Sequence, residues 1–221
     1  IDKFKDYDSD TLMSVVSEIG RLNELEVVDS NKIGDREGLK YLPDGPEGPE
    51  VHTPEAFKKI YEVVKDSGYV GATMPTQYGG GGAPFTTAIL AGEVGIASNM
   101  AFYMGPGLSH GAMKTILKKA TEELKDKYLP NMTSGEWMGT MCLTEPQCGT
   151  DLGLIKSTAK PVDDHYELNG QKIWISFGEH DLTENIIHLV LARTPDAPAG
   201  IKGISLFLVP KRLDDNSRNP I

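Results

Sequence analysis

The hydrophobic pattern of the sequence changes character near residue 135, and this change limits the folds that the chain can adopt. Before Gly135 the apolar residues recur at the three- and four-residue spacing of amphipathic helices. After Glu136, short apolar runs are separated by turn residues, which is typical of β-strands. Helices followed by strands predict an α+β protein rather than alternating α/β units. We therefore expect an all-α N-terminal domain over residues 1–135 and a β-domain over residues 136–221.

The N-terminal half carries several helix boundaries. Ser9 or Asp10 can cap a first helix, whose apolar face runs from Leu12 to Leu22. Thr53-Pro54 predicts the start of another helix, which ends at Gly68. Further helices are predicted at residues 84–104, 107–118 and 121–129.

We expect the C-terminal half to form an antiparallel β-sandwich or barrel. The pair Asn169-Gly170 predicts a tight hairpin turn, because this dipeptide suits the positive φ angles of a two-residue β-turn. Strands are predicted at residues 137–143, 156–161, 165–168, 172–177, 185–193 and 203–210. Residues 214–221 are polar and rich in turn residues, so no further strand or long helix is predicted over them.

Two Gly-rich segments in the first half are interpreted as connections. Residues 37–51 are rich in Gly, Pro and acidic residues, which predicts a solvated connector. Residues 75–82 carry four consecutive glycines but lack the Gly-Lys-Ser/Thr ending of a phosphate loop, and no strand precedes them. A phosphate-binding role is therefore not predicted for them.

Composition narrows the classes of partner. The net charge of −10 and the pI near 5.0 argue against nucleic acid or an anionic membrane surface. No apolar run approaches the length of a membrane span and no signal peptide pattern is present, so we expect a cytoplasmic protein. Cys142 and Cys148 lack metal-ligand spacing and are interpreted as reduced structural thiols. The five histidines show no metal spacing either, so no metal site is predicted.

Two segments in the C-terminal half together look like a flavin site. Residues 141–151 run from an apolar strand into the turn Cys148-Gly149-Thr150-Asp151, which offers backbone N–H groups and hydroxyls to a ligand. Residues 169–176 form the second segment, Asn169-Gly170-Gln171-Lys172-Ile173-Trp174-Ile175-Ser176.

These residues resemble the acyl-CoA dehydrogenase family, whose members are FAD enzymes that oxidise the Cα–Cβ bond of acyl-CoA thioesters. The core Leu143-Thr144-Glu145-Pro146-x-x-Gly149-Thr150-Asp151 matches the first family signature, with less typical residues at Cys148 and Leu154. Three other elements follow the family order: Tyr78-Gly79-Gly80, the segment 169–176, and the strand 203–210. The resemblance implies that the β-domain over residues 136–221 is incomplete, because further strands and a C-terminal four-helix domain would lie beyond Ile221.

The resemblance also implies roles for individual residues. Leu143 N–H and Thr144 would bond the flavin, Trp174 would cover one face of its ring, and Ser176 would bond its edge. Gly149 and Thr150 would contact the pyrophosphate or the CoA side of the ligands. The residues implied to bind cofactor are Met141, Leu143, Thr144, Gly149, Thr150, Trp174, Ile175 and Ser176, and Thr150 is also implied for substrate.

The residues themselves leave plainer interpretations open. Trp174 can be a core aromatic, Thr144 an ordinary strand residue and Glu145 a structural carboxylate. The apolar run Met100 to Met104 can line an acyl pocket or belong to the core.

No residue in this sequence is nominated as the catalytic base, because the resemblance places it in the C-terminal helical domain. Residues 1–221 alone are therefore expected to be inactive. The family implies an acyl-CoA substrate, an electron-transferring flavoprotein as electron acceptor, and a homodimer or homotetramer. The stretches 177–181 and 185–193 are similar to a bacterial branch that includes 3-methylmercaptopropionyl-CoA dehydrogenases. Two alternatives remain open: an acyl-CoA oxidase or other flavoenzyme on the same scaffold, and a non-catalytic flavin or acyl-CoA binding module.

Overall fold

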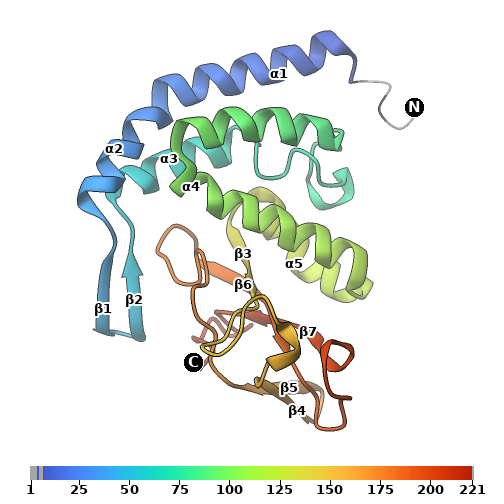
Figure 1. Ribbon diagram of the computed structural model, residues 1–221. Coiled ribbons are helices and arrows are strands. Elements are labelled where there is room, and N and C mark those ends of the chain that lie inside the picture. The colour runs from blue at the N-terminus through green and yellow to red at the C-terminus, as the bar shows by residue number, and fades with distance from the viewer. Residues whose placement is uncertain (1–3, 5–6, 221) are drawn as a thin grey trace.

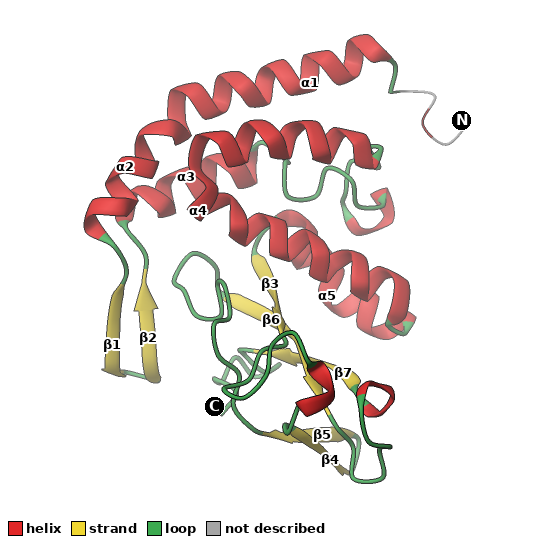
Figure 2. Cartoon of the chain, in the orientation of Figure 1, coloured by secondary structure: helices red, strands yellow, loops and turns green. Residues whose placement is uncertain are grey.

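The computed structural model describes residue 4 and residues 7–220, and it confirms the α+β prediction. A helical half forms one end of the molecule and a half built from strands and long loops forms the other (Figure 1). One pair of strands, β1 (Lys40–Gly45) and β2 (Gly48–His52), lies within residues 1–135 and extends from the helical half (Figure 2). The prediction that this half contains only helices was therefore wrong.

The first helix is longer than its hydrophobic pattern indicated. α1 (Ser9–Leu22) continues through a π-helical stretch, Asn23–Val27, into α2 (Val28–Glu37). Its N-cap is Asp8, whose carboxylate accepts from the backbone N–H of Thr11 at 2.8 Å, and not Ser9 or Asp10 as predicted.

The segment predicted as a connector at residues 37–51 is a β-hairpin. β1 (Lys40–Gly45) pairs antiparallel with β2 (Gly48–His52) around a turn in which Gly45 lies opposite Gly48. Gly48 has φ +106°, a conformation open mainly to glycine. The prediction failed because most of this hairpin is exposed and so lacks the apolar alternation that marks a half-buried strand.

The remaining helices surround a long central one. α3 (Glu55–Asp66) is followed by α4 (Phe85–Lys119) and α5 (Glu122–Ser134), whose N-cap is Thr121. α4 joins the two helices predicted at 84–104 and 107–118. It is interrupted at Asn99 (φ −154°, ψ 90°), whose side chain accepts from the N–H of Phe102 at 3.0 Å and so caps the second half.

Helix α4 is also the one helix of the described residues that length and apolar composition would allow to cross a membrane. The sequence analysis predicted no such span. We describe α4 as the central helix of the helical half, because it contacts α1, α2, α5 and the strand β3 (Trp137–Cys142).

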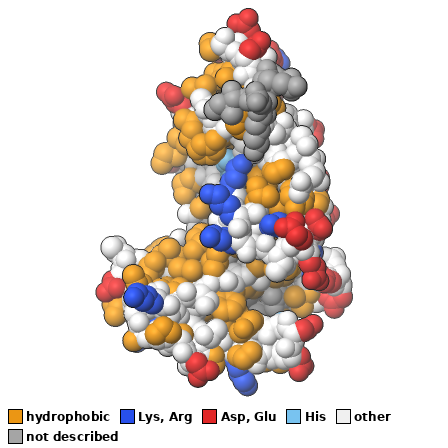
Figure 3. Space-filling view, turned by 90° about the vertical axis from the view of Figure 1, so that its right-hand side faces the viewer, with side chains coloured by type: hydrophobic (Ala, Val, Ile, Leu, Met, Phe, Trp, Pro, Cys, Tyr) orange, Lys and Arg blue, Asp and Glu red, His pale blue; other side chains and the backbone are white. Residues whose placement is uncertain are grey.

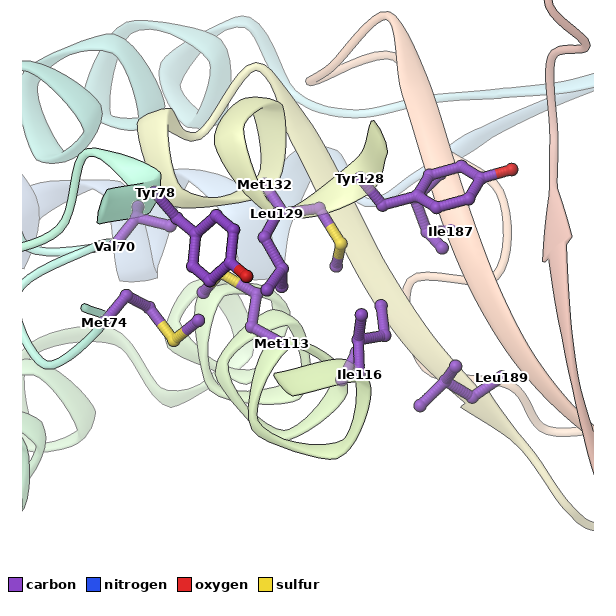
Figure 4. Packing of buried hydrophobic residues seen from close by; sticks show 11 residues of the cluster. Val70, Met74, Tyr78, Met113, Ile116, Tyr128, Leu129, Met132, Ile187 and Leu189 are labelled. Carbon is purple, nitrogen blue, oxygen red and sulfur yellow. The ribbon is translucent and has the colours of Figure 1, made fainter. Parts of the chain in front are cut away.

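A shared core joins the two halves. Side chains of α4, α5 and the strand β6 (Asn185–Ala192) converge in it, among them Met113, Ile116, Leu129, Met132 and Ile187 (Figure 4). All five are at most 2% exposed. Because this cluster takes residues from helices and from a strand, the helical half and the β half bury apolar surface against each other.

The main sheet has three strands in the order β3-β6-β7. β3 (Trp137–Cys142) runs parallel to β6 (Asn185–Ala192), and β6 pairs antiparallel with β7 (Ser205–Pro210). The prediction of antiparallel strands throughout was therefore wrong for β3 and β6. A long crossover connects these two strands, and parallel pairing requires such a connection.

That crossover contains a separate hairpin, β4 (Thr158–Val162) with β5 (His165–Asn169). Its turn lies between Val162 and His165. The other hairpin, predicted around Asn169-Gly170 between residues 165–168 and 172–177, does not form. Gly170 follows β5 with φ +154°, and a Cβ there would lie 2.3 Å from Ser157 Oγ. The strand predicted at residues 172–177 is irregular backbone.

The boundary between the two halves falls where α5 ends. Gly135, with φ +87°, follows Ser134 and leads directly into β3. We propose residues 1–135 and 136–221 as the two domains.

Candidate flavin site

The site begins at the end of β3, where the chain leaves the sheet. Leu143 and Thr144 follow the last strand residue, Cys142. A tight turn comes next, in which Glu145 and Cys148 exchange backbone hydrogen bonds of 2.8 and 3.0 Å. The turn directs the chain away from the sheet and leaves Leu143 and Thr144 partly exposed at its edge.

The structure brings the two sequence motifs together. The backbone N–H of Ile173 donates to the carbonyl of Thr144 at 3.0 Å. This bond brings together two segments that are about thirty positions apart in the sequence. We call these segments, residues 143–144 and residues 173–176, the two walls of the candidate site.

Trp174 projects from the second wall into solvent, with 86% of the residue exposed. Its backbone has φ +59°, and Phe177 has φ +55°. Such angles are unusual for bulky residues and persist only where the surroundings impose them. A large exposed indole on a constrained backbone is available to stack on a flat ligand. Trp174 is therefore not part of a core within the residues that the structure describes.

Three hydroxyl groups near these walls are free to bond a ligand. Among the described residues, Thr144, Thr150 and Ser176 make no side-chain hydrogen bond, and none of the three is buried. A Cβ at the adjacent Gly149 would meet only Thr144, at 3.4 Å, so that position does not require glycine for space. Donors, hydroxyls and an exposed indole are the groups that a flavin would need here.

The other predicted residues lie differently. Ile175 is partly buried and accepts from the N–H of Gly178 in a turn, through its carbonyl. Met141 packs against the core cluster around Met113 and Ile187. Met141 therefore supports the site from the core side.

Glu145 lies beneath the walls as a buried carboxylate with four hydrogen bonds. Its Oε1 accepts from Lys172 Nζ at 2.8 Å and from Ser157 N–H at 3.1 Å. Its Oε2 accepts from Lys156 N–H at 2.8 Å and from Gln147 Nε2 at 2.6 Å. Burial opposes ionisation, but the hydrogen bonds from Lys172, Ser157, Lys156 and Gln147 outweigh it and lower the pKa of Glu145 to about 2.

Comparison with known proteins identifies the family. The acyl-CoA dehydrogenase N-terminal domain matches residues 46–136, and the acyl-CoA dehydrogenase middle domain matches residues 140–220. The chain belongs to the acyl-CoA dehydrogenase family.

Individual relatives agree with this assignment. The chain is 41% identical to 3-methylmercaptopropionyl-CoA dehydrogenase of Ruegeria pomeroyi, over 95% of this chain and 35% of the relative. It is 38% identical to a butyryl-CoA dehydrogenase of Syntrophomonas wolfei, over 95% of this chain and 34% of the relative. A solved acyl-CoA dehydrogenase from Bacillus anthracis, complexed with FAD, has a similar fold, with a TM-score of 0.73 and 23% identity over 94% of this chain and 32% of that one. The chain thus spans about a third of the length of these proteins.

The apolar run Met100 to Met104, for which the sequence allowed either an acyl pocket or the core, has both buried and exposed members in the structure. Phe102 is fully buried in the core, while Met100 and Met104 are exposed at 60% and 42%. Tyr103 is buried but also lines an apolar pocket of about 300 Å³ between α1 and α4. Figure 3 shows that hydrophobic side chains are exposed over both halves on the face that it draws.

A second, polar cleft of about 800 Å³ lies between the β1–β2 hairpin, α3 and residues 179–184. Asp181 lines this cleft and bonds the start of α3. Its Oδ1 accepts from Thr53 N–H at 2.9 Å and from Thr53 Oγ1 at 2.7 Å, and its Oδ2 pairs with Lys58 at 2.9 Å. Thr53, predicted to open α3, therefore connects that helix to the β half.

Histidine 180 is buried beside this cleft and is neutral. Its Nδ1 accepts from Leu182 N–H at 3.2 Å, which places the ring proton on Nε2. Burial, followed by the charge of Lys211, lowers the pKa of His180 to about 3. Cys142 and Cys148 are both unpaired and buried, as predicted. No cluster of three metal-binding side chains occurs within residue 4 and residues 7–220.

Lys172 is the residue that the sequence analysis missed. Its Nζ donates to the carbonyl of Leu143 at 3.2 Å as well as to Glu145. The available indication was a lysine directly before the apolar run Ile173-Trp174-Ile175.

Proposed function

We propose that the full-length protein is an FAD-dependent acyl-CoA dehydrogenase, to which this chain contributes the N-terminal helical and middle β-domains. The supporting observation is the junction of Thr144 with Ile173, which joins the two family motifs and places the exposed Trp174 beside them. FAD, when bound, would accept the hydride that leaves the substrate β-carbon.

The residues proposed to hold FAD are the eight implied by the family resemblance. Leu143 N–H and the Thr144 hydroxyl would donate toward the part of the ring where negative charge develops on reduction. Trp174 would exclude water from one face of the ring, and Ser176 would bond its edge. Gly149 and Thr150 would meet the pyrophosphate, with Thr150 also reaching the substrate. Met141 and Ile175 would support these contacts from behind.

Glu145 is a poor candidate for the base that removes the substrate α-proton. Its pKa of about 2 and its four hydrogen bonds leave it neither basic nor free at neutral pH. We propose instead that the base lies in the C-terminal helical domain found in full-length family members. Residues 1–221 alone should then fail to reduce an artificial acceptor with acyl-CoA.

The proposed substrate is a short or medium acyl-CoA, with a sulfur-bearing chain as one candidate. This rests on the 41% identity to 3-methylmercaptopropionyl-CoA dehydrogenase and on the 38% identity to butyryl-CoA dehydrogenase. The kcat/KM values for 3-methylmercaptopropionyl-CoA, butyryl-CoA and palmitoyl-CoA decide it, and a clear preference for palmitoyl-CoA would refute it.

We further propose an electron-transferring flavoprotein as acceptor, a homodimeric or homotetrameric assembly, and a cytoplasmic location. An acyl-CoA oxidase would instead reduce oxygen, so comparing turnover with an electron-transferring flavoprotein and with oxygen separates the two activities. A binding module would retain FAD and acyl-CoA without turning over.

The central experiment is reconstitution of the full-length protein with FAD. We expect a flavin absorbance spectrum that is bleached by acyl-CoA, and weaker flavin retention after Trp174→Ala. Absence of bound flavin after reconstitution would reject the proposal.

A further inference from the structure

The side chain of Lys172 connects the two walls of the candidate flavin site. Its Nζ lies 3.2 Å from the Leu143 carbonyl and 2.8 Å from Glu145 Oε1, and only 12% of its side chain is exposed. Adjacent to it in sequence, Ile173 N–H bonds the Thr144 carbonyl at 3.0 Å. One wall is thus attached to the other through a side chain and through the backbone, at consecutive positions.

Glu145 extends this attachment to a third segment. Its carboxylate also accepts from the N–H groups of Lys156 and Ser157, where the chain approaches β4. Its side chain is 2% exposed, so these bonds do not compete with bulk water. The Lys172–Glu145 pair therefore fixes Leu143, the tight turn and residues 156–157 relative to one another.

The backbone just after Lys172 requires such a constraint. Trp174 and Phe177 hold positive φ angles of 59° and 55°, which a bulky residue adopts only when surrounding contacts impose them. Trp174 itself is 86% exposed and is held little by its own side chain. The bonds of Lys172 and Ile173, directly before Trp174, attach this backbone to the end of β3, whereas the bond of Ile175 on the other side closes only a local turn with Gly178.

We propose that Lys172 and Glu145 are positioning residues of the flavin site. The pair sets the distance between the Leu143–Thr144 wall and Trp174. The ammonium group of Lys172 also donates a hydrogen bond to the Leu143 carbonyl. This inference rests on the proposed function, because it assumes that these walls hold FAD. A pair that served only stability would affect unfolding and leave bound flavin unchanged.

The test compares Lys172→Met with Lys211→Met in the full-length protein. Lys211 is a matched control: its side chain is also 12% exposed, and its Nζ likewise bonds one carboxylate, Glu179, and one carbonyl, that of His180. For each variant, FAD dissociation constant, flavin absorption spectrum, flavin reduction potential and thermal midpoint are measured.

We expect Lys172→Met to weaken FAD binding roughly tenfold or more, the worth of a hydrogen bond to a charged group, and to shift the flavin spectrum and reduction potential. Lys211→Met should lower the thermal midpoint while leaving all three flavin readouts unchanged. If Lys172→Met does not fold, Lys172→Arg, which keeps the charge but changes the donor geometry, should show a smaller shift of the same sign.

Two results would overturn the inference. Equal flavin readouts in the Lys172 variants and the control would show that the pair is only structural. A wild-type protein that binds no FAD would reject the proposed function and the inference together. This outcome can be told apart from failure of the inference alone, because it is seen in the wild type before any substitution is made.

Discussion

Replacing Glu145 with Gln should change how the stability of the protein responds to acid. The carboxylate has a pKa of about 2 in the fold against an ordinary value of 4.5. This difference corresponds to about 3 kcal/mol of stability at neutral pH. Because the folded pKa is the lower one, that stability is fully present above about pH 5 and is lost as the pH falls toward 2.

Linkage gives the expected size of the change at each pH. The wild-type protein should lose about 1 kcal/mol of this contribution by pH 4 and about 2 kcal/mol by pH 3. Glu145→Gln removes the charge. The NH₂ group of the glutamine would also face the N–H groups of residues 156–157, so that two donors meet and a hydrogen bond is lost. The variant should be less stable than wild type by about 3 kcal/mol or more at pH 7, because a buried partner, Lys172, also loses its counter-charge.

The assay is urea unfolding of the wild-type and variant full-length proteins at pH 7, 5, 4 and 3. Other carboxylates titrate in both proteins, so their contributions cancel in the difference. The stability gap should narrow steadily below pH 5. A gap that stays constant from pH 7 to pH 3 would refute the argument, since it would mean that Glu145 has the same pKa folded and unfolded.

Three other predictions can be checked by stability measurements. His180 has a pKa of about 3 in the fold against an ordinary 6.5, so the stability of the fold decreases as the pH falls below 6.5. His180→Gln should remove about 2 kcal/mol of the stability that the wild type loses between pH 7 and pH 5. An unchanged dependence of stability on pH would contradict this. Gly170→Ala would place a Cβ 2.3 Å from Ser157 Oγ and should lower the thermal midpoint strongly, whereas Gly20→Ala, which meets nothing within 4 Å, should be neutral or stabilising. Asn99→Ala removes the cap of the second half of α4 and should cost about 1–2 kcal/mol in urea unfolding.

Sequence periodicity was sufficient where a segment buries one face. The predicted helix after Thr53-Pro54 appears as α3, because Phe57, Ile60 and Val64 are buried on one side of it. β6 and β7 were likewise predicted near their observed bounds. In each of these segments the pattern of burial is local, so the sequence carries it directly.

Hydrophobic periodicity did not predict the segments that are mostly exposed or whose structure depends on partners distant in the sequence. The β1–β2 hairpin is mostly exposed and has little apolar pattern to detect. The parallel pairing of β3 with β6 depends on a crossover that no local feature reveals. Residues 172–177 have the composition of a strand, but Gly170 lies against Ser157, and the backbone beyond it bonds Thr144 without forming a ladder.

For the candidate site, the sequence located the two motifs but not their connection. Motif order predicted that residues 143–144 and 174–176 belong to one site, and the bond between Thr144 and Ile173 accounts for their proximity. The buried Lys172–Glu145 pair could not be predicted from the sequence, because lysine and glutamate are usually exposed and no local pattern shows that these two are buried together.

The loop over residues 171–184 shows how the fold can hold an exposed aromatic residue in a defined position. Near its start, Lys172 and Ile173 are attached to Leu143, Thr144 and Glu145. Near its end, Asp181 is attached to Thr53 and Lys58 at the start of α3. The residues between these anchors include the two with positive φ angles, Trp174 and Phe177. Because both anchors bond to other parts of the fold, any adjustment on ligand binding should be confined to the few residues between them, so the indole can meet a flat ligand without a change in the sheet or in α3.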